Sequence, residues 1–137
     1  MSFVLDASSA LAWCFDGEAT PASDALLDRT EAEDVAVPSI WPLEIANALA
    51  IAERRHRISP AQIAEYLALL DGLTLTIDPP SLKRAFVEIR GLARSESLSA
   101  YDAAYLDLAM REGLPLATRD QALLDAAHRL GVAVIAA

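Results

Sequence analysis

The chain has a single cysteine, Cys14, so it can form no internal disulfide and no cysteine-based zinc site. We expect Cys14 to be a buried, small apolar side chain in a cytoplasmic protein. Glycine is also scarce, with five residues, and 54% of the chain is hydrophobic, which excludes a disordered tail. No uncharged run approaches the roughly 18 residues that span a bilayer. Asp6 interrupts the first apolar run, and no basic segment precedes it, so we predict neither a membrane helix nor a signal peptide.

Basic residues are few as well. Eleven Lys and Arg face twenty Asp and Glu, for a net charge of −9. Nucleic-acid binders are usually basic, so this balance argues against a nucleic-acid protein of the ordinary kind. An acidic protein can still act on phosphates if its acids gather around bound metal ions. The function therefore depends on whether the acids cluster.

Short apolar runs alternate with helical patterns along the chain. We predict strands at residues 3–5, 35–37, 73–77, 114–118 and 132–135. We predict helices from Ser8 or Ser9 onward and over residues 20–33, 43–57, 60–70, 81–93, 99–109 and 120–130. This alternation predicts one α/β domain over residues 1–137, with a central parallel sheet between layers of helices, an α/β/α sandwich. In such sheets, functional groups collect beyond the carboxyl ends of the strands.

Two acids stand where a site of this kind would form. Asp6 directly follows the first apolar run and could be a helix N-cap, although Ser8 and Ser9 are already available for that role. Glu44 lies in a segment in which Asn47 is the only other polar residue between positions 40 and 52. A helix that is apolar on nearly every side is expected to be buried, and buried Glu is rare unless it is paired or bound to metal. A first-turn Glu that favours the helix dipole would leave Asn47 unexplained, so we prefer a functional role.

Two further acids have good structural explanations. Asp120 follows the run 114–118 and could cap the next helix, although Thr118 and Asp120 beyond a strand end could also form a metal or water site. Asp102 stands three residues after Ser99, the spacing of a capping box, and taken alone it is a helix cap.

Other charged residues have ordinary explanations. Asp107 lies four residues before Arg111, which predicts an exposed salt bridge. Asp78 precedes two prolines and is a turn acid. Arg54, Arg55 and Arg57 could contact RNA phosphate, but cations at a helix C-terminus explain them better.

If all four of these acids were purely structural, their positions at strand ends or helix starts would be a coincidence: Asp6, Glu44, Asp102 and Asp120. Carboxylates that gather this closely repel one another and need a cation at neutral pH. Mg²⁺ takes oxygen ligands, with one or two protein carboxylates and several waters. Two such ions about 4 Å apart can activate water in phosphodiester cleavage.

The segments FVLDASSAL, PLEIANAL, LSAYDAAYLDLA and LPLATRD, in this order and spacing, resemble the PIN-domain nucleases, and most closely the VapC toxins of bacterial toxin–antitoxin pairs. The resemblance covers essentially the whole chain. It implies a parallel sheet flanked by helices, an acidic Mg²⁺ or Mn²⁺ site, and endoribonuclease activity restrained by a cognate antitoxin. It also implies a homodimer with an apolar helical face as its interface, and an antitoxin tail that places an Arg among the acids.

The resemblance further implies roles for individual residues. Asp6 and Asp102 match the metal-binding acids, and Glu44 and Asp120 match the remaining acids of the site. The supporting positions are two hydroxyls and an amide: Ser8, Thr118 and Asn47.

Two alternatives remain open. A receiver-like phosphoacceptor would need an acid pair at the first strand end and a lysine near the last strand, whereas Asp6 stands alone and Lys83 is the only lysine. A PIN-like interaction module without catalysis would keep the same residues, and only a cleavage assay separates it from a nuclease. The sequence does not distinguish transfer, ribosomal and messenger RNA as the substrate.

Overall fold

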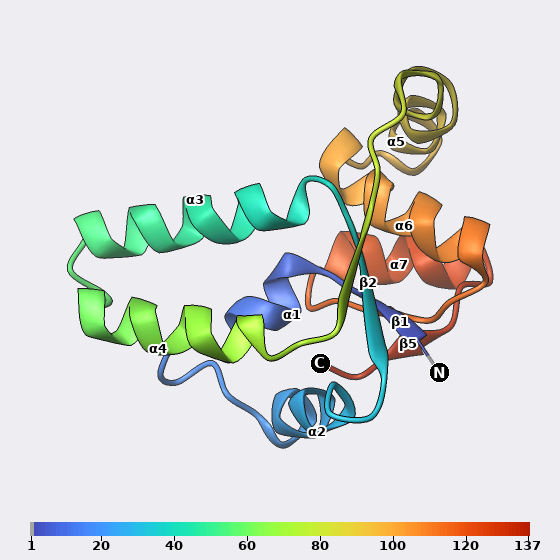
Figure 1. Cartoon of the computed structure of the whole chain (residues 1–137). Coiled ribbons are helices and arrows are strands. Elements are labelled where there is room, and N and C mark those ends of the chain that lie inside the picture. Colours follow the sequence, from blue (N-terminus) through green and yellow to red (C-terminus); the bar gives the residue numbers. More distant parts are fainter. Residues whose placement is uncertain (1) are drawn as a thin grey trace.

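The computed structural model describes residues 2–137, which form one five-stranded sheet with helices on both faces (Figure 1). The strands are β1 (Ser2–Leu5), β2 (Asp34–Pro38), β3 (Leu75–Asp78), β4 (Leu116–Ala117) and β5 (Val134–Ile135). All neighbouring pairs are parallel, in the order β3-β2-β1-β4-β5. The predicted α/β/α fold is confirmed, and every predicted strand is present within a residue or two of its expected position.

Strand β1 is the point at which the strand order reverses. The chain first extends the sheet to one side through β2 and β3, then returns to the other side of β1 with β4 and β5. The register places Phe3 beside Val35 and Leu5 beside Ala117. Since the strands are parallel, their carboxyl ends meet at one edge of the sheet. In open α/β sheets, ligands bind in the crevice at such a reversal point.

The helices divide between the two faces according to this topology. They are α1 (Ala7–Leu11), α2 (Pro21–Arg29), α3 (Trp41–Arg54), α4 (Pro60–Asp71), the π-helical segment η1 (Arg84–Ile89), α5 (Arg90–Glu96), α6 (Ala100–Glu112) and α7 (Gln121–Arg129). Right-handed crossovers place α1–α4 on one face and the later helices on the other. Figure 1 shows α3 and α4 as a hairpin that projects from the sheet, with α6 and α7 across from it.

Local sequence determines where several helices begin. Thr20 and Ser59 form reciprocal capping boxes with Ser23 and Gln62, and each is followed by a proline at the first helical position. Ser99 caps α6 by accepting a hydrogen bond from the backbone N–H of Asp102 at 3.1 Å.

The core lies between α6 and the sheet and extends beneath α1. Strand β1 is completely buried at Phe3, Val4 and Leu5, which agrees with a central strand that is covered on both faces. The side chain of Tyr66 on α4 donates to the carbonyl of Ala10 at 2.6 Å, which ties the hairpin to α1. None of the helices in the part of the chain that the structure describes is long and apolar enough to cross a membrane.

Three predictions need correction. The helix that begins at residue 41 is not buried on all sides: Ile45 and Leu49 face the core, whereas Leu43 is 66% exposed. The predicted helix over residues 81–93 is a π-helical turn followed by α5. Cys14 is half-buried and packs at the border of the core.

The predicted salt bridge between Asp107 and Arg111 is present at 3.6 Å, but it is not the exposed pair that was expected. Asp107 is buried, and its two carboxylate oxygens accept hydrogen bonds from Arg84 of η1. Arg111 also makes two hydrogen bonds with Asp78, at 2.7 and 3.1 Å, and these are shorter than its 3.6 Å salt bridge to Asp107. Asp78 is therefore an ion-pair partner at the end of β3 and more than a turn residue. The Arg84–Asp107 and Arg111–Asp78 ion pairs connect η1 and β3 to α6.

Candidate active site

Asp6 lies directly beyond the carboxyl end of β1, at the reversal point of the sheet. Its backbone N–H donates to the carbonyl of Ala117 at 2.9 Å, so the β1–β4 pairing fixes its position. The residue is 4% exposed. Its Oδ2 accepts hydrogen bonds from the hydroxyls of Ser8 and Thr118, both at 2.6 Å.

The two hydroxyls also accept hydrogen bonds from the backbone of the segment that follows β4. Ser8 Oγ accepts from the N–H of Arg119, and Thr118 Oγ1 accepts from the N–H of Asp120, both at 3.1 Å. Each hydroxyl therefore joins the Asp6 carboxylate to the backbone beyond β4. The structure brings Ser8, Thr118 and Asp6 together, as their predicted positions require.

Asp120 caps α7 and lies near the other acids. Its Oδ1 accepts a hydrogen bond from the backbone N–H of Leu123 at 2.9 Å, as its capping interpretation predicts. Its negative charge also raises the pKa of both Asp6 and Asp102, which places Asp120 close to them. The Asp120 side chain therefore caps α7 and also belongs to the acid cluster.

Glu44, in the first turn of α3, accepts a hydrogen bond from the hydroxyl of Tyr105 at 2.7 Å. Tyr105 is fully buried in α6. Burial, together with the hydrogen bond to Glu44, raises the pKa of Tyr105. Sequence reasoning missed this contact because Tyr105 lies among apolar residues. The signal was its position three residues after Asp102, on the same face of the helix.

Asp102 is half-buried in the first turn of α6. Its backbone N–H completes the Ser99 cap, so the capping prediction is correct for Ser99. Burial of the Asp102 carboxyl raises its pKa, and the charges of Asp120 and Asp6 raise it further. The side chain therefore belongs to the same electrostatic cluster as the other acids.

The four acids lack compensating cations. Burial is the largest cause of the raised pKa of Asp6 and of Glu44, and the charges of Asp6 and Asp102 add to the increase at Glu44. Within residues 2–137, none of the four forms a salt bridge to Lys, Arg or His. Clustered carboxylates without a basic partner are the chemical condition that a divalent cation relieves.

The donor set fits a hard cation with a partly hydrated shell. All the side-chain donors are oxygens, and both hydroxyl bonds to Asp6 end on Oδ2, so neither hydroxyl occupies Oδ1. In the described chain, no three His, Cys, Asp or Glu side chains converge into a ready-made metal cage. Mg²⁺ takes one or two protein carboxylates and keeps several waters, so it does not need such a cage.

Asn47 does not join this cluster. It is exposed on α3, and no side-chain hydrogen bond connects it to the acids among the residues that the structure covers.

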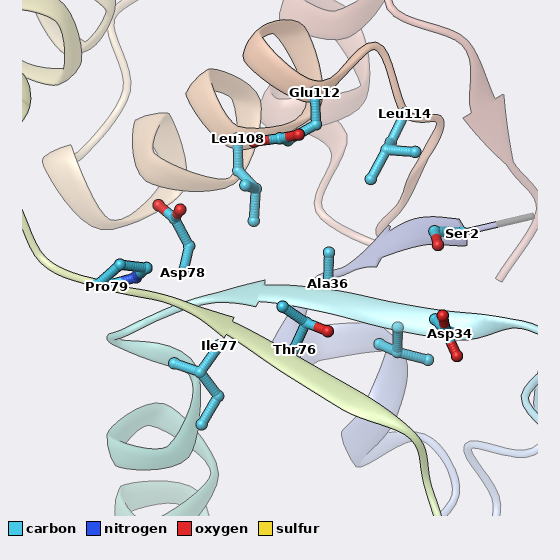
Figure 2. Close-up of a pocket in the computed structure, with 11 residues that line it drawn as sticks. Ser2, Asp34, Ala36, Thr76, Ile77, Asp78, Pro79, Leu108, Glu112 and Leu114 are labelled. Atoms are coloured by element: carbon cyan, nitrogen blue, oxygen red, sulfur yellow. The ribbon is translucent and has the colours of Figure 1, made fainter.

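A separate cavity of about 250 Å³ lies between α6 and strands β2 and β3, with Leu108 and Glu112 above the sheet (Figure 2). None of the four clustered acids lines this cavity.

Comparison with known proteins identifies a family and a shared fold. The PIN-domain family model matches residues 3–129. No curated protein matches the chain.

Three solved structures share the fold. PAE2754 from Pyrobaculum aerophilum is 26% identical, with 92% of this chain and 84% of that chain covered and a TM-score of 0.69. FitAcB from Neisseria gonorrhoeae is 21% identical over 98% of this chain and 96% of that chain, with a TM-score of 0.64. VapBC2 from Rickettsia felis, solved with a DNA fragment from its promoter, is 15% identical over 98% and 97% of the two chains, with a TM-score of 0.64.

Proposed function

The chain belongs to the PIN-domain family of nucleases, and from this premise we propose that it is a metal-dependent endoribonuclease and the toxin of a toxin–antitoxin pair. The observation that carries the proposal is the cluster of Asp6, Glu44, Asp102 and Asp120, which has no basic partner in the described chain. The chain also lacks a cysteine–histidine pair near this cluster that could act as a protein nucleophile. Water is then the nucleophile that fits the site.

Asp6 and Asp102 would hold Mg²⁺ or Mn²⁺, with Glu44 and Asp120 beside them. When bound, the metal supplies activation of water and stabilisation of the leaving oxygen. Ser8 and Thr118 hold the Asp6 carboxylate in one orientation through Oδ2. Tyr105 does the same for Glu44 through Oε1.

The decisive experiment compares two aspartate-to-asparagine variants. Asp102→Asn removes one charge from the cluster and should abolish Mg²⁺- or Mn²⁺-dependent RNA cleavage. It should leave the metal-free protein as stable as the wild type or more stable, because repulsion among the acids falls. Asp125→Asn on α7 is the matched control: Asp125 is exposed, and its contact is a hydrogen bond from Gln121 at 2.8 Å.

The readouts are RNA cleavage with and without EDTA and the metal-induced rise in melting temperature. We expect both signals in the wild type and in Asp125→Asn, and neither in Asp102→Asn. Cleavage that persists in EDTA, or full activity of Asp102→Asn at saturating Mg²⁺, would contradict the proposal. A wild-type protein that binds RNA without cutting it would favour a non-catalytic interaction module.

We also propose that an antitoxin restrains this site. An uncompensated acidic cluster on a protein of net charge −9 favours a basic partner segment. The likeness to VapBC2 and FitAcB in fold is compatible with such an assembly. The antitoxin tail would place an Arg among the acids. A complex in which the antitoxin leaves Asp6 and Asp102 open to solvent would refute this arrangement.

A homodimer is proposed on separate grounds. Several large apolar side chains are exposed in the first turns of α3 and α6, just before η1 and along η1: Leu43, Tyr101, Leu82, Phe86 and Val87. A second copy of the chain would cover them. Sedimentation that gives a monomer at micromolar concentration would contradict this.

A further inference from the structure

The turn between α3 and α4 concentrates positive charge in an acidic protein. Arg54, Arg55, His56 and Arg57 follow one another, and all four are exposed. Elsewhere Arg29, Arg84, Arg111 and Arg129 are used in salt bridges. None of the three arginines of the turn forms a salt bridge with an acid of residues 2–137. Their charge remains available to a ligand.

The turn is held in a fixed shape. Helix α3 ends at Arg54, Arg55 is its C-cap, and His56 adopts a left-handed conformation with φ of 56°. The Arg57 guanidinium lies 4.7 Å from the centre of the Phe15 ring, so it packs against the loop after α1. Arg54 and Arg55 are the two arginines of the turn that have no such packing partner. The favourable position of a cation at a helix C-terminus explains one such residue better than a run of three.

Helical geometry connects this turn to the acid cluster. Arg55 lies eleven residues after Glu44, which is three turns of an α-helix within about 20°. Both residues therefore lie on the same face of α3, about 16 Å apart along the helix axis. Asn47 and Ile51 lie between them on this face, and Asn47 is exposed. Figure 1 shows that α3 runs without interruption from the sheet to the far end of the hairpin.

We propose that the RNA substrate lies along this face of α3, with Arg55 bound to its phosphates about five stacked nucleotides from the bond that is cut, at roughly 3.4 Å per nucleotide. Arg54, which lies about 80° around the helix from this face, adds a second phosphate contact at the end of α3. The inference rests on the proposed function. It follows because the acid cluster itself repels a polyanion, and a net charge of −9 provides no general attraction. Affinity for RNA must then come from local phosphate contacts, which are the usual source of binding free energy. The exposed Asn47 amide lies along the same path and can donate to the backbone.

The test uses the full-length chain that carries Asp102→Asn, so that RNA remains intact and binding is measured without cleavage. Arg54→Gln/Arg55→Gln removes two charges from the turn, and Arg57 is left in place because it packs on Phe15. Arg90→Gln/Arg94→Gln removes two charges from exposed arginines of α5, on the other side of the molecule, and is the matched control. Glutamine and arginine have similar helix propensities, so both variants should melt like the parent.

Binding is followed by fluorescence anisotropy with labelled RNAs of four and sixteen nucleotides at 50–200 mM salt. For the longer RNA, we expect the α3 variant to raise Kd roughly tenfold and to reduce the slope of log K against log salt by about 1.4, which corresponds to two phosphate contacts on a single strand. The control should change neither quantity, and the RNA of four nucleotides should not distinguish the variants.

Equal Kd and salt slope for the α3 and control variants would overturn the inference. It would also be overturned if the α3 variant lost affinity for poly-glutamate while its RNA binding was unchanged, because the turn would then serve an acidic protein segment. Failure of the wild type to cut RNA would refute the proposed function alone, because the binding measurement does not depend on cleavage.

Discussion

Substitution of Thr118 tests whether the buried carboxylate of Asp6 depends on uncharged hydrogen-bond donors. Thr118 is 3% exposed. Its hydroxyl donates to Asp6 at 2.6 Å and accepts from the N–H of Asp120 at 3.1 Å. Thr118→Val keeps the branched shape and removes both hydrogen bonds. Thr118→Ser keeps the hydroxyl and removes one methyl group, so it is the matched control.

The cost of Thr118→Val follows from the two hydrogen bonds that it removes. A hydrogen bond to a charged group contributes about 1.5–3 kcal/mol, and an unsatisfied buried N–H costs about 1–3 kcal/mol. Asp6 can respond by binding a proton, which makes the total smaller than the sum of these two costs. We therefore expect the free energy of unfolding to fall by about 2–4 kcal/mol. Removal of one buried methyl in Thr118→Ser costs about 0.5–1.5 kcal/mol. For a domain of this size, 1 kcal/mol corresponds to about 4 °C in Tm. The valine variant should melt roughly 8–16 °C lower and the serine variant roughly 2–6 °C lower.

The metal titration gives a second, independent readout. Loss of a donor raises the pKa of Asp6 further, because the charged carboxylate loses one of its two hydroxyl partners. Metal binds the deprotonated carboxylate, so Thr118→Val should need more Mg²⁺ to reach half-maximal cleavage. Melting in EDTA and a Mg²⁺ titration of cleavage measure the two effects. If the valine and serine variants melted together and required the same Mg²⁺ concentration, the hydroxyl would have no role in holding Asp6.

Three further predictions concern the same network. Tyr105→Phe keeps the buried ring but removes the donor to Glu44, so cleavage should fall and the pKa of Glu44 should rise, as measured by the pH–rate profile; an unchanged profile would contradict the contact. Asp107→Asn should destabilise the protein by more than the 0.2–0.5 kcal/mol or so of an exposed helix pair, because the carboxylate is buried against Arg84; urea unfolding measures this, and a smaller loss would count against the buried pair. In EDTA, stability should increase as pH falls from neutral through the raised pKa values of Asp6 and Asp102 toward the ordinary value of 3.8, because the folded state binds these protons first; a steady loss over that range would oppose the assignment.

The sequence allowed the fold to be predicted because its signals are local. The apolar runs at residues 3–5 and 35–37 pair as expected, and Thr20 and Ser59 cap helices where their prolines indicated. The acids at strand ends could be grouped without coordinates, because parallel strands end at the same edge. That reasoning placed Asp6 and Asp120 together.

The features that escaped prediction are non-local. Asp107 was assigned to Arg111 because that pair has helical spacing, yet its main partner is Arg84, 23 residues away on another helix. Whether a face of α3 is exposed depends on which other helices or strands pack against it. A run of apolar residues does not specify those packing partners. The partnership of Tyr105 with Glu44 spans 61 positions and depends on how α3 and α6 pack.

The capping and the functional explanations of Asp102 and Asp120 are not competitors, and this determines how the site must be tested. Asp120 uses Oδ1 for its cap, while its charge still acts on Asp6 and Asp102. At Asp102 the cap bond runs from the backbone N–H to the Ser99 hydroxyl, so an asparagine at this position keeps that bond. Alanine at Asp120 would remove cap and charge together, whereas asparagine can still accept the cap bond and loses only the charge. Loss of cleavage in the asparagine variants, with the fold intact, therefore assigns the defect to charge.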